Sequence, residues 1–232
     1  MKKSIGEENA LMLFWKKGEK EMTSYIWDLD GTLLDSYGVI VESAARTAAE
    51  AGVRDSAEDV LRGVKQGTVT SYLTGVSARS GISLQQLLAR YRLYTHGLDD
   101  RITLIDGAKE TLEELSSSGA DHFVYTHRGG SSGPILQRLG ILDRFREIVT
   151  SEYGFSPKPS GEGVRYLLDK YSLEPEQTWY VGDRTLDVSC AKDAGVRALL
   201  YLAPDSCVSS TGQEDRIVRD LREIPNQNRR NF

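Results

Sequence analysis

Hydrophobic residues follow two different patterns along the chain. Between about residues 37 and 100 they recur at helical spacing, with almost no strand pattern. The clearest stripe lies between Leu84 and Leu98, where apolar side chains stand three and four residues apart and Ser83 is placed to cap the helix. Shorter helices are expected before it, at about 41–48, 56–61 and 68–78. The pattern predicts a compact, all-helical unit.

The rest of the chain alternates short apolar runs with helical patterns. Strands are expected at 25–27, 122–126, 148–150, 179–181 and 198–201, with helices between them and a last helix around Ile217, Val218 and Leu221. Repeated strand–helix units predict a parallel sheet with helices on both faces. The expected fold class is therefore α/β, a three-layer Rossmann-like sheet core into which the all-helical unit is inserted.

The first strand ends in two carboxylates. Asp28 and Asp30 follow the apolar run 25–27, and Gly31 after them lets the backbone turn. Because an unpaired carboxylate is costly to bury inside a strand, both are expected where the strand ends. Alternation of side chains points them roughly the same way. This arrangement favours a metal site, or a nucleophile beside an acid/base, although an ordinary Asp-rich turn would have the same sequence.

Polar residues also stand where later strands are expected to end. Thr126 follows the second strand, Lys158 lies beyond the third, and Asp183 and Asp187 follow the fourth. Ligands of open parallel sheets bind at the carboxyl ends of the strands. We therefore expect these residues to share one crevice with the two acids of the first strand.

Four carboxylates in one crevice require a cation. Two unit charges about 4 Å apart repel by roughly 4 kcal/mol at an effective dielectric constant near 20. Ligands that are all oxygen suit a hard ion, so Mg2+ is the expected cofactor. Lys158 adds a charge suited to a phosphoryl group, and Thr126 with the backbone N–H groups of the glycine-rich turn after it suits phosphate oxygens.

Composition narrows the function classes. The 232 residues are 39% hydrophobic and 27% charged, with a formal charge of -5, which argues against a non-specific binder of nucleic acid or anionic membranes. No apolar run is long enough to cross a bilayer. Cys190 and Cys207 are too few for a disulfide framework and suit the cytoplasm. A Cys-x5-Arg phosphatase loop is excluded, because Val196 stands where the arginine would be needed.

Together these residues resemble the haloacid-dehalogenase (HAD) superfamily. Its four motifs are matched in order by Asp28-Leu29-Asp30-Gly31-Thr32, Thr126, Lys158-Pro159, and Gly182-Asp183 with Asp187. The resemblance covers about residues 23–221, and the helical unit right after the first motif resembles a type 1 cap. Subfamily I phosphatases that are phosphoglycolate-phosphatase-like are the most similar group. The resemblance implies a phosphoric monoester hydrolase that uses Mg2+.

The resemblance also implies roles for the motif residues. Asp28 would attack phosphorus and form an aspartyl phosphate, while Asp30 would protonate the leaving alcohol and then deprotonate water. Mg2+ would be held by Asp28, the backbone carbonyl of Asp30, Asp183 and Asp187. Thr126 and Lys158 would complete the catalytic set by binding the phosphoryl group. The residues expected on the phosphate or substrate side are Gly31, Thr32, Thr126, His127, Arg128 and Lys158, with Arg62 and Lys65 from the cap.

Several of these positions have an ordinary alternative. His127 and Arg128 stand where Asn and small residues are frequent, so either touches the substrate or caps the turn. Arg184 stands where a small residue is common; it reaches the substrate or pairs with an acid, and a surface salt bridge is the simpler expectation. Arg62 and Lys65, with Gln66, lie in a basic helical stretch, and such residues are more often solvated surface.

The expected division of the chain has four parts. A weakly ordered extension (1–22) precedes the core (23–36 and 102–224), which is interrupted by the cap (37–101) and followed by a tail (225–232). The expected partner is a small phosphorylated metabolite, with no nucleic acid and no membrane. We expect a cytoplasmic monomer or weak dimer.

Two other functions are weighed against the phosphatase. A phosphoglucomutase-like, phosphoryl-transferring mutase would have a Lys-Gly-x-Ser-Arg pattern in the cap, which is absent, and a valine where Thr32 stands. Dehalogenases do not keep the acid at the position of Asp30. A non-catalytic module that binds a phosphate ligand stays open, because retained motifs do not by themselves establish activity.

Overall fold

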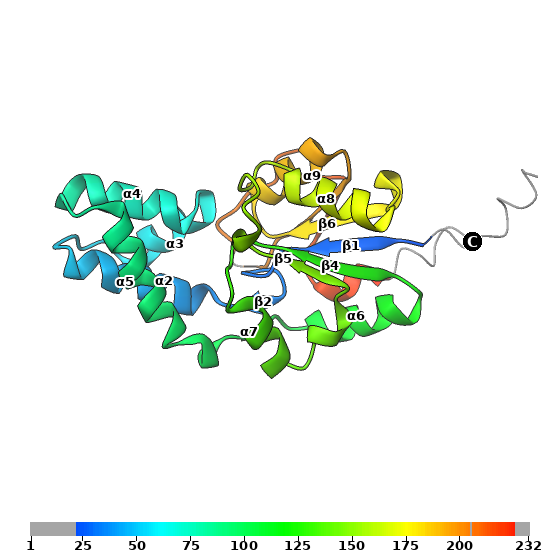
Figure 1. Ribbon diagram of the computed structural model, residues 1–232, viewed down its shortest axis with the longest axis horizontal. Coiled ribbons are helices and arrows are strands. Elements are labelled where there is room, and N and C mark those ends of the chain that lie inside the picture. The colour runs from blue at the N-terminus through cyan, green and yellow to red at the C-terminus, as the bar shows by residue number, and fades with distance from the viewer. Residues whose placement is uncertain (1–21, 205, 226–232) are drawn as a thin grey trace, which may run out of the picture.

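The computed structural model describes residues 22–204 and 206–225, and its centre is a six-stranded sheet (Figure 1). The strands lie in the order β5 (Glu147–Val149), β4 (Asp121–Tyr125), β1 (Ser24–Trp27), β6 (Thr178–Gly182), β7 (Arg197–Tyr201) and β8 (Arg216–Val218). Every neighbouring pair is parallel. The predicted α/β class with a parallel sheet is confirmed.

Helices cover both faces of this sheet. On one face lie α6 (Ala108–Ser117) and α7 (Ser132–Arg138), and on the other α8 (Glu162–Tyr171) and α9 (Thr185–Ala194) (Figure 1). Because successive side chains of a strand point to opposite faces, each face of the sheet has its own apolar core. Trp27 packs in the cluster that contains Leu112 and Ile135. Its neighbour Ile26 packs in the cluster that contains Leu167 and Val188. Because helices cover both faces of the sheet, successive residues of a strand, such as Ile26 and Trp27, are both apolar and buried.

Four further helices form a separate group beside the sheet: α2 (Tyr37–Glu50), α3 (Ala57–Gln66), α4 (Val69–Ser80) and α5 (Leu84–His96) (Figure 1). They have apolar clusters of their own, built around Leu73 and Val60. Ser83 caps α5, as predicted, by accepting a hydrogen bond from the backbone of Gln86. The chain leaves and re-enters the sheet region through β2 (Leu34–Asp35) and β3 (Thr103–Leu104), which pair antiparallel.

The predicted last helix around Ile217 and Leu221 is wrong. Residues 216–218 form the edge strand β8, and only a short 3-10 turn, Leu221–Glu223, follows. Burial alternates there as in a strand, since Ile217 is exposed and Val218 is buried. Three apolar residues were too few to distinguish the two periods. The expectations for 1–21 and 226–232 lie outside the described residues, and within the described part no helix is long and apolar enough to cross a membrane.

The order of the strands places the end of β1 at the centre of the molecule. After β1 the chain first builds β4 and β5 on one side, and only then β6, β7 and β8 on the other. Such a reversal leaves a crevice at the carboxyl ends of the strands that flank it. Asp28 lies there, with its backbone N–H donating to the carbonyl of Val181, and Gly31 turns the chain away at φ 83°.

A buried histidine beside β1 makes stability depend on pH. His122 is buried in β4, where its Nδ1 accepts a hydrogen bond of 3.1 Å from the indole N–H of Trp27. Burial lowers the pKa of His122 to about 4 from an ordinary 6.5. The unfolded chain therefore takes up this proton first, and the stabilisation present at neutral pH is lost as the pH falls from about 6.5 to about 4.

We expect the His122→Gln variant to tolerate mild acid better than the wild type, because glutamine still accepts from Trp27 but does not titrate. Between pH 7 and pH 5 the variant should lose about 2 kcal/mol less unfolding free energy in urea titrations. His96→Gln, at a side chain that is 84% exposed, is the matched control. Equal losses in the wild type and His122→Gln would contradict the prediction.

Candidate active site

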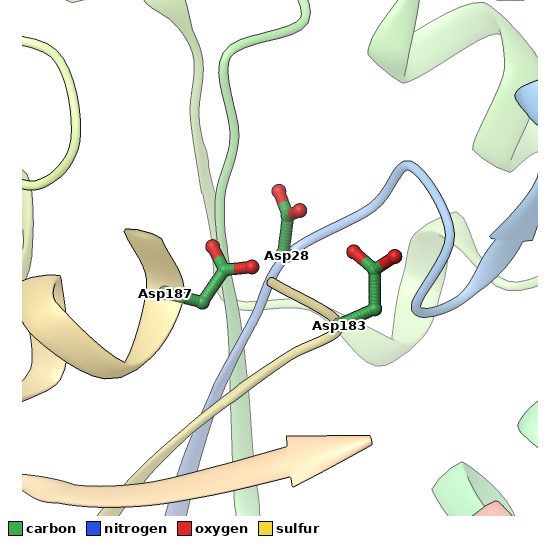
Figure 2. A group of neighbouring side chains, drawn as sticks. All are labelled: Asp28, Asp183 and Asp187. Atoms are coloured by element: carbon green, nitrogen blue, oxygen red, sulfur yellow. The ribbon is translucent and has the colours of Figure 1, made fainter. Parts of the chain in front are cut away.

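Three buried aspartates meet at the carboxyl end of the central strands (Figure 2). Asp28 follows β1, Asp183 follows β6, and Asp187 lies in the first turn of α9; an oxygen from each lies within 4.8 Å of the others. The glycine before Asp183 makes this approach feasible. A Cβ on Gly182 would lie 2.3 Å from the Cβ of Asp187, so a larger residue there would push that carboxylate away.

Lys158 is the nearest cation to two of these acids. Its Nζ lies 2.9 Å from Asp28 Oδ1 and 2.6 Å from Asp187 Oδ1, and it donates to the Tyr180 hydroxyl at 3.1 Å. Burial lowers the pKa of Lys158, but the attraction of Asp187 and Asp28 outweighs it and raises the pKa above the ordinary value. Lys158 therefore stays charged although its side chain is entirely buried.

Arg184 is a second buried cation, and not the surface salt bridge of the simpler expectation. Its side chain is only 8% exposed, and its Nη2 lies 3.5 Å from Asp28 Oδ2. Its Nε lies 3.9 Å from both Asp183 Oδ1 and Asp187 Oδ2. Its Nη1 donates at 3.5 Å to the carbonyl of Gly67, which follows α3 in the helical group. Arg184 thus touches both parts of the molecule.

Lys65 is the third cation, and it comes from the helical group. Its Nζ lies 3.2 Å from Asp183 Oδ2 and 4.3 Å from the centre of the Tyr37 ring. Tyr37, which the sequence reasoning missed, donates to Asp183 Oδ1 at 3.4 Å. Burial raises the pKa of Asp183 to about 6, although Lys65 and Arg184 lower it. The sequence did offer a signal for Tyr37, because it is the first residue of the helix that follows the acidic turn and must therefore lie near the acids.

Arg62 does not contact this cluster of acids. Its guanidinium pairs with Glu58 at 2.9 Å and Asp59 at 3.4 Å, the acids of the first turn of its own helix. These i, i+3 and i, i+4 contacts hold it on the exposed face of α3. Gln66 is exposed as well. Of the three candidates from α3, only Lys65 contacts the acids.

Asp30 lies apart from the three clustered aspartates. Arg128 binds its carboxylate through Nη2 at 2.6 Å and Nε at 3.1 Å, and donates through Nη1 to Asp99 and Ser131, both at 3.3 Å. Burial raises the pKa of Asp30, but the Arg128 contacts outweigh burial and the pKa is lowered. Arg128 therefore holds Asp30 in its ionised form.

The remaining motif residues shape the turns around the cluster. Thr126 is buried and its Oγ1 accepts from the backbone N–H of Arg128. His127 Nε2 accepts from the backbone N–H of Lys158 at 2.9 Å, while burial and the nearby Lys158 charge lower the pKa of His127 to about 4. His127 is thus a neutral acceptor that fixes the Lys158 loop. Thr32 is buried, and its Oγ1 has no partner among residues 22–204 and 206–225.

Gly31 permits the tightest approach in the site. A Cβ at this position would lie 2.1 Å from a ring carbon of Tyr37 and 2.6 Å from Asp183 Oδ2, in addition to the positive φ. Any side chain would therefore displace an aspartate of the cluster. This geometry explains why glycine follows Asp30 in the acidic turn.

The donor set fits a hard divalent cation. Asp28 Oδ2 and Asp183 Oδ2 are buried, and neither accepts a hydrogen bond of good geometry from the part of the chain that the structure describes. Their nearest cations are Arg184 Nη2 at 3.5 Å and Lys65 Nζ at 3.2 Å. A buried carboxylate oxygen that is not fully hydrogen-bonded is costly, and a cation with oxygen preference reduces that cost. The residues present therefore suit Mg2+.

Comparisons with known proteins show which family this chain belongs to. The family model described as haloacid dehalogenase-like hydrolase matches residues 25–201. Phosphoglycolate phosphatase of Pasteurella multocida is 31% identical over 180 residues, which are 73% of this chain and 80% of the relative. Pyrophosphatase PpaX of Bacillus velezensis is 29% identical over 182 residues, 77% of this chain and 82% of the relative.

A solved structure extends the comparison to the fold. A protein from Haemophilus somnus, described as a predicted phosphoglycolate phosphatase, superposes with a TM-score of 0.77 at 22% identity. The match covers 91% of this chain and 100% of that one, so it includes the helical group as well as the sheet.

We expect Lys158→Met to destabilise the protein strongly, because Asp28 and Asp187 would keep their burial and lose their nearest cation. Breaking a buried pair in this way costs about 3–5 kcal/mol, to be measured by urea unfolding at pH 7 without divalent cations.

Lys192→Met is the matched control, since Lys192 pairs with Asp215 on the surface at 2.6 Å and such pairs contribute about 0–1 kcal/mol. Similar losses in the two variants would show that Lys158 does not hold the cluster together.

Proposed function

The chain belongs to the haloacid dehalogenase-like hydrolase family, and from this premise we propose that it hydrolyses a small phosphate monoester with Mg2+, through a covalent phosphate on Asp28. Membership confirms the family resemblance, and the phosphoglycolate phosphatase among the relatives confirms the predicted class, a phosphoric monoester hydrolase. The observation that carries the proposal is Asp28 itself. Its Oδ2 is buried at the end of the central strand, accepts no hydrogen bond from the described residues and has Arg184 at 3.5 Å, while Lys158 pairs with its Oδ1.

Asp28, Asp183 and Asp187, with the backbone carbonyl of Asp30, would hold the metal. When bound, Mg2+ would supply positive charge to the oxygens of the reacting phosphoryl group. Lys158 supports the same charge from the protein side, because it stays protonated between Asp28 and Asp187. The hydroxyl of Thr126, which is buried after the end of β4, would donate to an oxygen of the phosphoryl group.

In the first step an oxygen of Asp28 forms a bond to phosphorus as the bond between phosphorus and the ester oxygen breaks. Asp30 gives its proton to that departing oxygen, so the alcohol leaves neutral. Because Arg128 holds Asp30 ionised, Asp30 must first take up a proton. The negative charge of an incoming phosphate ester favours this uptake, since a nearby like charge raises the pKa of a carboxyl group.

In the second step water attacks phosphorus and the bond between phosphorus and Asp28 breaks. Asp30, now ionised again, takes a proton from the attacking water. Inorganic phosphate is released and Asp28 returns to its carboxylate form. The strong hold of Arg128 on Asp30 suits this half of the reaction, in which a base is needed.

The helical group 37–101 acts as the cap of this site. Its Lys65 reaches Asp183 and its Gly67 carbonyl reaches Arg184, so the group lies over the acids in this arrangement. A cap of this kind excludes water and selects the leaving group. The two relatives described above are a phosphoglycolate phosphatase and a pyrophosphatase, and this supports a small phosphorylated metabolite as substrate. The cytoplasmic location and the monomeric or weakly dimeric state stay predictions.

Asp28→Asn tests the assignment of the nucleophile. The amide keeps the size of the side chain and relieves repulsion among the acids, so the fold should persist while hydrolysis falls by about a thousandfold or more. The measurement is phosphate release from a panel of phosphate esters, with Mg2+ and with a chelator.

A rate for Asp28→Asn equal to that of the wild type would contradict the nucleophile assignment. No turnover by the wild type on any ester of the panel with Mg2+ would favour the non-catalytic binding module instead.

A further inference from the structure

The surroundings of Arg184 are those of an arginine that binds an anion. Its side chain is buried, yet every contact of its guanidinium with an acid or carbonyl is 3.5 Å or longer. Its Nε finds no hydrogen-bond partner among the described residues. A buried guanidinium has five N–H donors to satisfy, and leaving them without close partners is costly.

Arg128, in the same site, is an arginine whose N–H donors have close hydrogen-bond partners. It approaches Asp30 to 2.6 Å through one nitrogen and to 3.1 Å through another, and it also reaches Asp99 and Ser131. Arg184 has three carboxylates near it and makes no contact of that quality with any. Its donors are therefore available to another partner.

We propose that Arg184 is a catalytic residue that binds the oxygens of the phosphoryl group as it moves onto Asp28. This inference rests on the proposed phosphatase function and adds a contact that the four motifs do not supply. The Nη2 of Arg184 lies 3.5 Å from Asp28 Oδ2, so a group bonded to Asp28 comes within reach of the guanidinium. The planar fork of arginine matches two phosphoryl oxygens at once.

The helical cap borders this arginine on the other side. Gly67 follows the last residue of α3, where the carbonyls carry partial negative charge, and its carbonyl lies 3.5 Å from Arg184 Nη1. The guanidinium therefore lies between the nucleophile and the cap, with only 8% of the side chain exposed. An arginine placed there can direct its N–H groups toward a phosphoryl group on Asp28.

Charge balance supports the same role. In the described residues, the three clustered aspartates are matched by Lys158, Lys65 and Arg184. A divalent cation and a phosphate ester dianion add opposite charges of equal size, so the occupied site is balanced only if Arg184 is present. Without Arg184 the site would carry an extra negative charge as further charge develops on the phosphoryl oxygens.

Arg184→Gln and Arg184→Lys test this role against two esters with Mg2+, p-nitrophenyl phosphate and the carboxylate-bearing phosphoglycolate. We expect Arg184→Gln to lower kcat/KM by about 100-fold or more, and by the same factor for both esters, because the phosphoryl group is common to them. Arg184→Lys should recover part of the loss, since it restores charge without the fork. Lys192→Gln, on the same helix but paired with Asp215 at the surface, should keep wild-type activity.

Binding of inorganic phosphate and inhibition by orthovanadate, both with Mg2+, supply a readout that does not need turnover. We expect Arg184→Gln to weaken both by about tenfold or more at an unchanged fold, followed by circular dichroism. Wild-type kcat/KM in Arg184→Gln overturns the proposal. So does a loss confined to phosphoglycolate, which would make Arg184 a reader of the leaving group, and so does lost stability with unchanged phosphate and vanadate binding.

Failure of the proposed function gives a different result. In that case the wild type hydrolyses neither ester, and comparison of phosphate binding between wild type and Arg184→Gln still decides whether Arg184 binds a phosphoryl group.

Discussion

The buried ion pairs of Lys158 with Asp28 and Asp187 are the constraint on which the site depends. The ammonium group lies 2.9 Å from one carboxylate and 2.6 Å from the other, with no exposed side-chain surface. Without it the two acids would repel, by roughly 4 kcal/mol at a separation of about 4 Å near a protein surface. The loop that delivers Lys158 is held by its backbone N–H on His127, and the ammonium group also donates to Tyr180. A single cation thus joins the end of β1 and the middle of β6 to the first turn of α9.

The remaining charge compensation comes from two parts of the chain. Arg184 stands at the start of α9, whereas Lys65 comes from α3 in the helical cap. Lys65 reaches Asp183, and the Gly67 carbonyl reaches Arg184, so the cap takes part in the electrostatics of the core. The sheet supplies the acids and the cap completes their surroundings. Residues of the sheet core and of the helical group thus surround the same three acids.

Sequence reasoning predicted the sheet and the convergence of Asp28, Lys158, Asp183 and Asp187. Asp28 and Asp183 come at the ends of strands, Lys158 and Asp187 lie a few residues beyond strand ends, and the ends of parallel strands share one edge. It could not predict partners that depend on side-chain direction. Arg62 and Lys65 stand three residues apart on α3. Only the structure shows that Arg62 pairs with Glu58 on its own helix, whereas Lys65 pairs with Asp183. Arg128 and Asp30 are 98 residues apart in the sequence, so no local sequence pattern indicates that they form an ion pair. The edge strand β8 was missed because three apolar residues fit both periods.

The most direct test of the account is to trap the covalent intermediate. Sodium borohydride reduces an acyl phosphate to an alcohol, so an aspartyl phosphate caught during turnover becomes homoserine, which peptide mass spectrometry detects. We predict homoserine at position 28, formed only when a phosphate ester and Mg2+ are both present. Homoserine at Asp30, or at no aspartate of an enzyme that is turning over, would contradict the assignment of Asp28 as the nucleophile.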